Sequence, residues 1–165
     1  MICVRTAQIK DIPQISFVHA ESWKTAYRGI VDDNYLDSLK TDHWVEYLTN
    51  GLNGDEVFSM VLLENQDIIG ASILRKSENQ CEIHMASLYL MPDRIGKDYG
   101  HRFYCEIENE IKSLGYAKCT LDVLADNKRA ISFYIAHGYI SFGAEETTVL
   151  GSRDYTYRKF YKELI

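Results

Sequence analysis

The chain has 165 residues and a formal net charge of −6 at pH 7, with 46% hydrophobic residues. This length and composition predict a single folded domain over residues 1–165. The negative charge argues against nucleic-acid binding, which needs a basic face. No apolar run is long enough to span a bilayer, and the first residues do not resemble a signal peptide. We therefore expect no membrane partner and a cytoplasmic location.

The cysteines are scattered and show no C-x-x-C spacing. Three of them lie in apolar or alternating segments, where cysteine is usually a small buried hydrophobe. This pattern predicts neither a metal site nor a disulfide framework.

The first third of the chain is predicted to be mostly helical after one short strand. Asp11 is expected to cap a helix that Gly29 ends, because apolar residues recur between them at steps of three and four. The other predicted elements are a strand over 2–7 and short helices over 33–39 and 42–52.

The middle of the chain alternates as strands do. Apolar runs separated by turn residues predict strands over 57–63, 68–75 and 82–90. A stripe of four-residue spacing then predicts a helix over 103–114, with Gly115 just beyond its end.

The C-terminal third predicts a strand over 118–124, a helix over 128–137 and a strand that starts at 139–142. A last hairpin is expected to have its arms at 147–150 and 155–164. The order of elements predicts one mixed sheet flanked by helices.

The segment 91–100, Met-Pro-Asp-Arg-Ile-Gly-Lys-Asp-Tyr-Gly, joins a predicted strand to a predicted helix. A short glycine-containing turn lets backbone N–H groups point outward. The first turn of a helix also offers unpaired donors and the positive end of its dipole. The segment therefore predicts an anion site.

A second segment, residues 127–139, carries a motif of spaced residues: Asn127, Ala130, Phe133, Tyr134, Gly138 and Tyr139. Together the two segments resemble the GNAT acetyltransferase superfamily, whose members use acetyl-coenzyme A (acetyl-CoA). The resemblance implies a single α/β (α+β) domain. Its central sheet would be mixed, mostly antiparallel and twisted, with about seven strands flanked by helices.

The resemblance also implies which residues meet the cofactor. Ile95 and Asp98 depart from the family pattern, which has Arg or Gln at the first position and Gly at the second. A carboxylate at Asp98 would repel a pyrophosphate, or it would simply cap the following helix. The implied cofactor-binding residues are Leu88, Leu90, Ile95, Gly96, Lys97, Asp98, Tyr99, Gly100, Asn127 and Tyr134.

Three residues are candidates for proton transfer. In the family, the tyrosine that matches Tyr134 sits beside the cofactor sulfur and can protonate the departing thiolate; the alternative is an aromatic wall. Glu82 and His84 lie two apart on one strand and so share a face. Either could take the proton of the acceptor amine. Alternatively, Glu82 is exposed at an edge and His84 is only a hydrogen-bonded sheet residue.

The resemblance places the acceptor between the first helical region and the last hairpin. Trp23, Tyr27 and Arg28 are therefore candidate substrate-binding residues, with Tyr155 and Tyr157 facing them. Alternatively, Trp23 and Tyr27 are a packing pair four apart on a helix, and Arg28 closes that helix.

The predicted function is transfer of acetyl from acetyl-CoA to a primary amine of a small molecule or peptide, in a ternary complex and without a metal. The departures at Ile95 and Asp98 leave two alternatives open. One is a CoA-binding sensor or interaction module that lacks turnover, and the other is a structural protein without a cofactor site. Dimers are common in the family, so a homodimer is possible.

Overall fold

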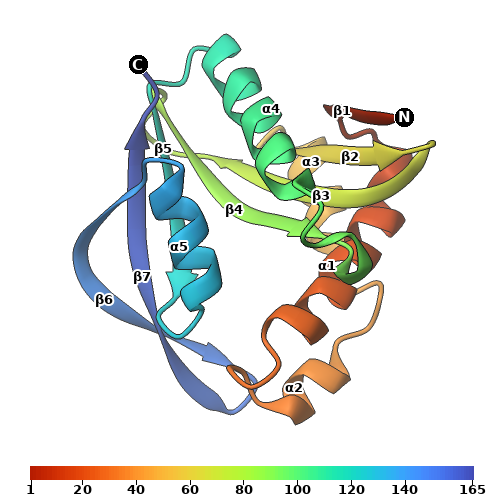
Figure 1. The fold of residues 1–165 in the computed structure, drawn as a ribbon, viewed down its shortest axis with the longest axis vertical. Helices are drawn as coiled ribbons and strands as arrows, with labels where there is room; N and C mark the ends of the chain where they lie inside the picture. The colour runs from red at the N-terminus through yellow and green to blue at the C-terminus, as the bar shows by residue number, and fades with distance from the viewer.

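A computed structural model describes residues 1–165 as one seven-stranded sheet with helices on both faces (Figure 1). The strands lie in the order β1-β2-β3-β4-β5-β7-β6. None of the helices is long and apolar enough to cross a membrane. The elements are β1 (Ile2–Thr6), α1 (Ile12–Ala26), α2 (Asp33–Ser38), α3 (Val45–Asn53), β2 (Val57–Glu64), β3 (Asp67–Lys76), β4 (Glu82–Leu90), α4 (Tyr99–Ser113), β5 (Lys118–Leu124), α5 (Lys128–Ala136), β6 (Ile140–Leu150) and β7 (Arg153–Glu163), with short 3-10 turns at Ile9–Asp11 and Pro92–Arg94.

The sheet opens in its middle. All neighbouring strands are antiparallel except β4 and β5, which run parallel. These two strands pair only from Glu82 with Lys118 to His84 with Thr120. Beyond that point they diverge, as Figure 1 shows. The predicted mixed, mostly antiparallel sheet is confirmed, and its split places a gap at the centre of the fold.

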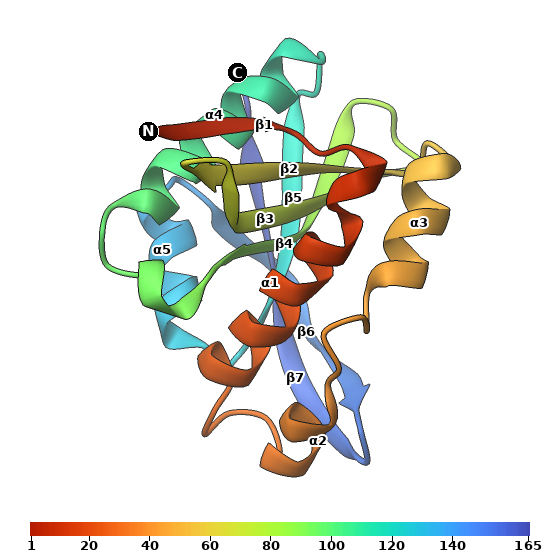
Figure 2. The same cartoon turned by 90° about the vertical axis from the view of Figure 1, so that its right-hand side faces the viewer.

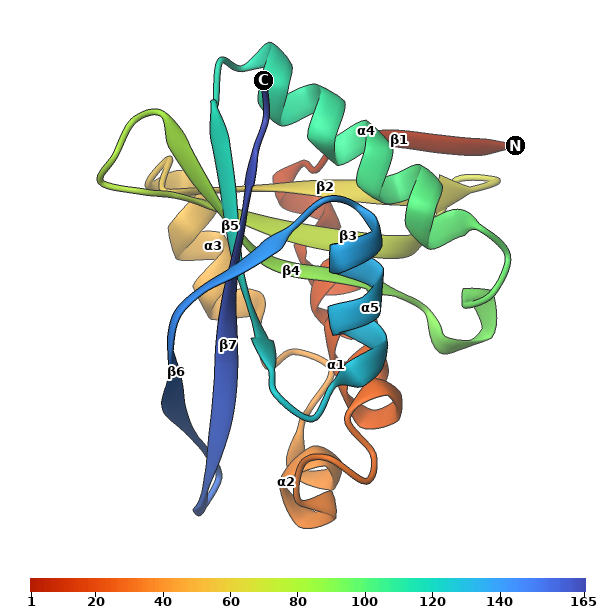
Figure 3. The ribbon, with the colours of Figure 1, turned by 60° about the vertical axis from the view of Figure 1, so that its left-hand side comes forward.

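The two faces of the sheet are covered differently. Helices α1 and α3 lie on one face (Figure 2), and α4 and α5 lie on the other, with α5 at the opening between β4 and β5 (Figure 3). The larger core lies under α4 and includes Phe103, Ile107 and Ile111. A smaller core lies under α1 and includes Ile15 and Val18. Strand β3 contributes to both cores because it is buried on both faces.

Asp11 precedes α1 as predicted, but it does not cap that helix. Its carboxylate accepts from the backbone N–H of Gln8 at 2.8 Å and from the Arg5 guanidinium at 2.6 and 3.1 Å. These bonds hold the pKa of Asp11 below its usual range, chiefly through Arg5. The predicted N-cap is therefore wrong, because the buried carboxylate is already paired with Arg5.

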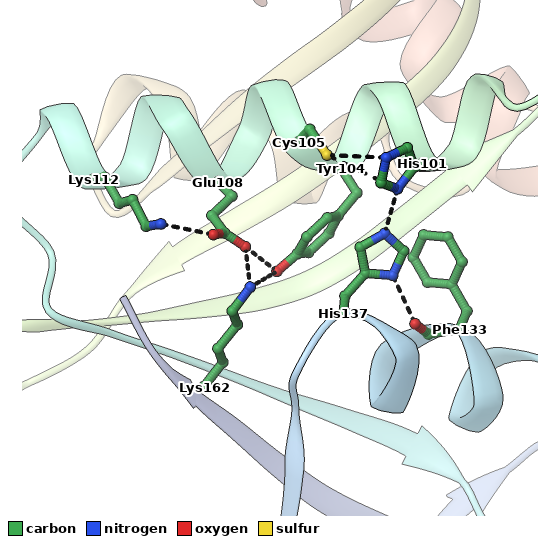
Figure 4. Close-up of polar contacts among 8 residues, drawn as sticks. All are labelled: His101, Tyr104, Cys105, Glu108, Lys112, Phe133, His137 and Lys162. Carbon is green, nitrogen blue, oxygen red and sulfur yellow. Dashed lines mark hydrogen bonds and ion pairs between the residues drawn. The ribbon is translucent and has the colours of Figure 1, made fainter. Parts of the chain in front are cut away.

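Helix α4 begins at Tyr99, a turn before the predicted start, so Gly100 lies in the helix and not in the turn. Lys162 of β7 donates to Glu108 at 2.5 Å, as does the hydroxyl of Tyr104, and Lys112 donates to it at 2.8 Å (Figure 4). The two lysines and the tyrosine lower the pKa of Glu108 to about 2 although its burial acts to raise it. This network fixes α4 against the sheet.

The other C-terminal elements follow the prediction with one merger. Asn127 caps α5 by accepting from the N–H of Ala130 at 3.2 Å, as predicted. Gly115 and Gly138 follow α4 and α5 with φ near +90°, which confirms their places after the helix ends. The two expected strand pieces at 139–142 and 147–150 form the single strand β6, whose register with β7 shifts between Phe142 and Glu146.

Candidate functional site

The turn between β4 and α4 presents a row of free donors. The backbone N–H groups of residues 96–101 have no acceptor within the protein, and the first helical bond of α4 is donated by Arg102 to Asp98. Gly96 has a φ of +87°, a conformation that favours glycine. Six consecutive free donors at a helix N-terminus make this turn a candidate anion site.

Glu64, at the end of β2, holds this turn in place. Its carboxylate accepts from Arg94 Nε at 2.8 Å and from the Tyr99 hydroxyl at 2.9 Å. The pKa of Glu64 is lowered by these two partners. The Arg94 side chain is therefore already bound to Glu64. It lies one residue before Ile95, the position where the family pattern has Arg or Gln.

Asp98 immediately precedes α4 and makes no capping bond. Its φ of +61° lies in the left-handed region, which explains why a glycine suits this position. The alternative that Asp98 caps α4 is wrong. An exposed carboxylate therefore stands beside the free donors of the turn.

The gap between β4 and β5 continues the site toward the centre of the sheet. The N–H of Met91 donates to Ile69 of β3 at 2.8 Å, so alternation along β4 directs the backbone of Leu88 and Leu90 toward the gap. The carbonyl of Leu90 is already bound by the Ser22 hydroxyl at 2.7 Å. The free strand edge suits an extended chain with its own amide groups.

Tyr134 belongs to α5, the helix that lies at this opening (Figure 3). Burial is the main cause that raises the pKa of Tyr134, and the nearby Tyr27 and Cys119 add to it. Its hydroxyl therefore stays protonated at neutral pH. The hydroxyls of Tyr27 and Tyr89 lie 3.0 Å apart, and burial also raises the pKa of both. A cluster of protonated phenols thus lies where the two strands part.

A cavity of about 340 Å³ lies on the side of α1 and α3. Aromatic rings pack against one another along its wall: the ring centroids of Trp23 and Trp44 are 5.8 Å apart, and those of His43 and Trp44 are 4.5 Å apart. No carboxylate, lysine or arginine lines it. The lining residues are His19, Trp23, His43, Trp44, Tyr47, Ile73, Ala86, Ser87 and Tyr89.

His84 lies at the last pair before β4 and β5 separate. Its Nδ1 is 3.0 Å from Thr120 Oγ1, and its Nε2 is 3.8 Å from Asp122 Oδ2. Burial lowers the pKa of His84 although Asp122 acts to raise it, so the imidazole is neutral at physiological pH. Glu82 lies two residues further from the gap and is bound by Lys118 at 3.1 Å.

Arg28 and Tyr155, which were expected at the acceptor site, do not line this cavity. Arg28 is on the surface, 3.1 Å from Asp33 and 2.9 Å from Asp37. The Tyr155 hydroxyl accepts from the N–H of Asp32 at 2.8 Å, which joins the last hairpin to the loop before α2. Of the three proposed residues, Trp23 lines the cavity and Tyr27 is buried behind it.

The family model described as "Acetyltransferase (GNAT) family" matches residues 18–139, which include the turn and α5. The chain belongs to the GNAT acetyltransferase family. A curated relative, the spermidine N(1)-acetyltransferase of Thermoplasma acidophilum, is 28% identical over 141 residues, covering 82% of this chain and 86% of the relative. A second, an uncharacterised N-acetyltransferase of Bacillus subtilis, is 26% identical over 157 residues, covering 93% of this chain and 88% of the relative.

Solved structures agree with this membership. The PaiA N-acetyltransferase of T. acidophilum in complex with coenzyme A is 25% identical to this acetyltransferase, with a TM-score of 0.75 and 99% of both chains covered. The ribosomal-protein-S18-alanine N-acetyltransferase of Escherichia coli shares the fold at 17% identity, with a TM-score of 0.71 and 99% of this chain and 94% of that chain covered.

Sequence reasoning missed several groups that shape the candidate site of this acetyltransferase. Glu64 gave no local signal, because its partners Arg94 and Tyr99 lie about 30 residues away in the sequence. His19 of α1 and Ser87 of β4, whose side chains lie 2.7 Å apart, were missed for the same reason, because 68 residues separate them in the sequence. The sequence carried one signal of the irregularity in β4. Its apolar residues lie at odd positions up to Met85 and at even positions from Leu88 onward.

Proposed function

We propose that the protein transfers acetyl from acetyl-CoA to a primary amine of a small molecule or peptide, within a ternary complex. The observation that carries this proposal is the row of free N–H donors at residues 96–101 beside the opened strands. The donors suit a pyrophosphate, and the free edge of β4 suits the amide-bearing pantetheine arm. Acetyl-CoA would supply a thioester whose acetyl group the amine accepts.

The residues of the turn and gap have distinct roles in this proposal. Donors from Gly96 to Gly100 bind the pyrophosphate, with Lys97 as an exposed cation nearby. The N–H groups of Leu88 and Leu90 orient the pantetheine arm, and one of them can polarise the thioester carbonyl. Asn127 starts the helix that carries Tyr134.

Two protons must move during this reaction. Tyr134 keeps its proton at neutral pH and can donate it to the leaving thiolate. His84 is neutral at the same pH, and it lies at the point where the strands part, so we assign it the amine proton. Glu82 is a weaker candidate because Lys118 already binds its carboxylate.

Named relatives support amine acetylation. One relative is a spermidine acetyltransferase, and a structural neighbour is a ribosomal-protein alanine acetyltransferase. The cavity beside β4 is a suitable acceptor site because its aromatic wall can hold a cationic or apolar amine. Asp98 favours a second candidate, a CoA-binding module with little turnover, because its carboxylate stands beside the anion site.

Replacing Tyr134 by Phe tests the enzyme proposal. Loss of a general acid is expected to lower kcat about a hundredfold, while the Kd of CoA stays within about twofold because the ring remains. Thiol release with a panel of amines measures kcat, and calorimetry measures the Kd. The control is Tyr116→Phe, a half-buried tyrosine away from the gap.

Equal losses of turnover and CoA affinity in the Tyr134 variant would refute the acid role. If the unmodified protein binds CoA but acetylates no amine in the panel, the binding module is the better description. Absence of any thermal shift with acetyl-CoA would contradict both candidates.

A further inference from the structure

A serine of β4 and a buried histidine of α1 meet beside the acceptor cavity. His19 Nε2 lies 2.7 Å from Ser87 Oγ, and His19 Nδ1 lies 2.9 Å from the carbonyl oxygen of Ile15. The histidine is 1% exposed. Both side chains line the cavity.

The hydrogen bonds of this pair determine its protons. A backbone carbonyl only accepts, so His19 carries its proton on Nδ1 and donates it to Ile15. The unprotonated Nε2 must then accept, and the Ser87 hydroxyl donates to it. Burial lowers the pKa of His19 to about 4, which keeps the imidazole neutral at physiological pH.

A second bond fixes the oxygen of Ser87. The N–H of Ile73 on β3 donates to Ser87 Oγ at 3.0 Å. A hydroxyl has one proton and two lone pairs. The proton is used by His19 and one lone pair by Ile73, so a single lone pair remains. Ser87 can therefore offer the cavity an acceptor but no donor.

A bulge in β4 directs this group into the cavity. Ile73 pairs with Ser87 and Leu74 pairs with Met85, so Ala86 is the extra residue. The bulge reverses the alternation of faces along β4. Met85 lies in the core under α4, whereas Tyr89 packs on the side of α1. Without the bulge, Ser87 would point away from α1.

We propose that Ser87, with its hydroxyl held by His19, is the residue that positions the acceptor amine by accepting one of its N–H groups. This inference rests on the proposed acetyl transfer. The amine keeps its lone pair free for the thioester carbon, and Ser87 neither gains nor loses a proton. No carboxylate, lysine or arginine lines the cavity, and the Ser87 oxygen is held in place there by both His19 and the Ile73 N–H, so it is a fixed acceptor for the nitrogen.

Steady-state kinetics of Ser87→Ala test this role, using the panel amine that the unmodified protein acetylates best. The loss of one positioning hydrogen bond is expected to lower kcat/KM for the amine by about three- to tenfold, with the KM of acetyl-CoA unchanged. Ser87→Thr keeps the hydroxyl and should retain most of the activity. The control is Ser72→Ala, which removes a buried hydroxyl of β3 whose only bond is to the Met60 carbonyl at 3.5 Å.

Three results would overturn the inference. The first is a Ser87→Ala variant with unchanged amine kinetics. The second is an equal change in the amine and acetyl-CoA parameters, or a loss that Ser87→Thr does not rescue, since either indicates a structural role. The third is that no amine is acetylated by the unmodified protein, which removes the proposed function itself. The first two results leave acetyl transfer intact. Failure of the Ser87 role can therefore be distinguished from failure of the proposed function.

Discussion

At the scale of single residues, the turn before α4 combines a favourable backbone with an unfavourable side chain. Gly96 and Asp98 both have positive φ, and their conformations help free the N–H groups of the turn. Glycine adopts this conformation readily, whereas aspartate does so at a cost. Asp98 also adds a negative charge where the proposed pyrophosphate binds. The conformation is thus a cost to folding, and the charge is expected to oppose anion binding.

Replacing Asp98 by Gly is expected to tighten CoA binding. Two unit charges about 4 Å apart repel by roughly 1 kcal/mol in water and 4 kcal/mol at an intermediate dielectric, so the Kd of CoA should fall about tenfold. Calorimetric titration with CoA measures the gain. Asp98→Asn is the matched variant, because it removes the charge but still tolerates positive φ.

If the repulsion dominates, Asp98→Asn should reproduce most of the gain, and added salt should reduce the difference from the unmodified protein. Unchanged or weaker binding in both variants would show that the carboxylate does not face the phosphates.

At the scale of elements, the anion site depends on how the turn is tied to its neighbours. Glu64 accepts hydrogen bonds from two residues of this segment: Arg94, which precedes the free donors, and Tyr99, at the start of α4. At the far side, His137 Nδ1 donates to the Phe133 carbonyl at 2.7 Å, so its Nε2 accepts from His101 at 2.8 Å (Figure 4). The start of α4 is therefore held by both β2 and the end of α5.

Replacing Glu64 by Ala is expected to loosen the turn without unfolding the domain. Both Arg94 and Tyr99 lose their partner, so CoA binding should weaken by about three- to tenfold, the effect of one or two modest hydrogen bonds. Calorimetry measures the Kd, and amide hydrogen exchange over residues 94–101 measures the loosening.

A suitable control is Glu145→Ala, which breaks a 3.5 Å ion pair with Arg158 on the C-terminal strands. Unaltered exchange over 94–101 in the Glu64 variant would mean that the turn does not need this carboxylate.

At the scale of the whole molecule, the open sheet leaves titratable side chains buried beside its centre. His19 and His84 lie on α1 and β4, and burial lowers the pKa of both. A histidine that stays neutral in the folded state but binds a proton when unfolded makes stability depend on pH. The contribution of His19 is fully present above its ordinary pKa of about 6.5.

The free energy of unfolding is expected to fall as the pH drops from about 6.5 toward 4. The native pKa of His19 is about 4, so the unfolded chain binds the extra proton in this window. The loss attributable to His19 is about 3 kcal/mol over the full window, at about 1.4 kcal/mol per pH unit. Urea unfolding at about pH 7 and about pH 4.5 measures most of it.

His19→Gln should flatten this dependence, with a residual slope from His84. Paired carboxylates such as Glu108, whose native pKa is about 2, lose their contribution as the pH falls from about 5 toward 2, so they overlap only the acid end of this window. A variant whose pH dependence equals that of the unmodified protein would show that His19 titrates normally in the folded state.

The local elements of this protein could be predicted from its sequence. The cap at Asn127, the glycines after α4 and α5 and the stripe of α4 each depend on neighbours within a few residues. Such patterns predict where helices start and stop because capping and burial act over one or two turns. The errors were local as well. The turn before α4 is shorter than expected, and the Asp11 carboxylate binds Arg5 and does not cap α1.

The candidate site was predictable only in part. The elements, the two motifs and hence the family can be read from the sequence, because they depend on short spacings between residues. Which side chains face one another follows from the three-dimensional fold alone: Glu64 lies against Arg94, and His19 lies against Ser87 at a bulge. Strand register and the direction of a buried side chain depend on partners distant in the chain, and one extra residue in β4 turns the following side chains to the opposite face.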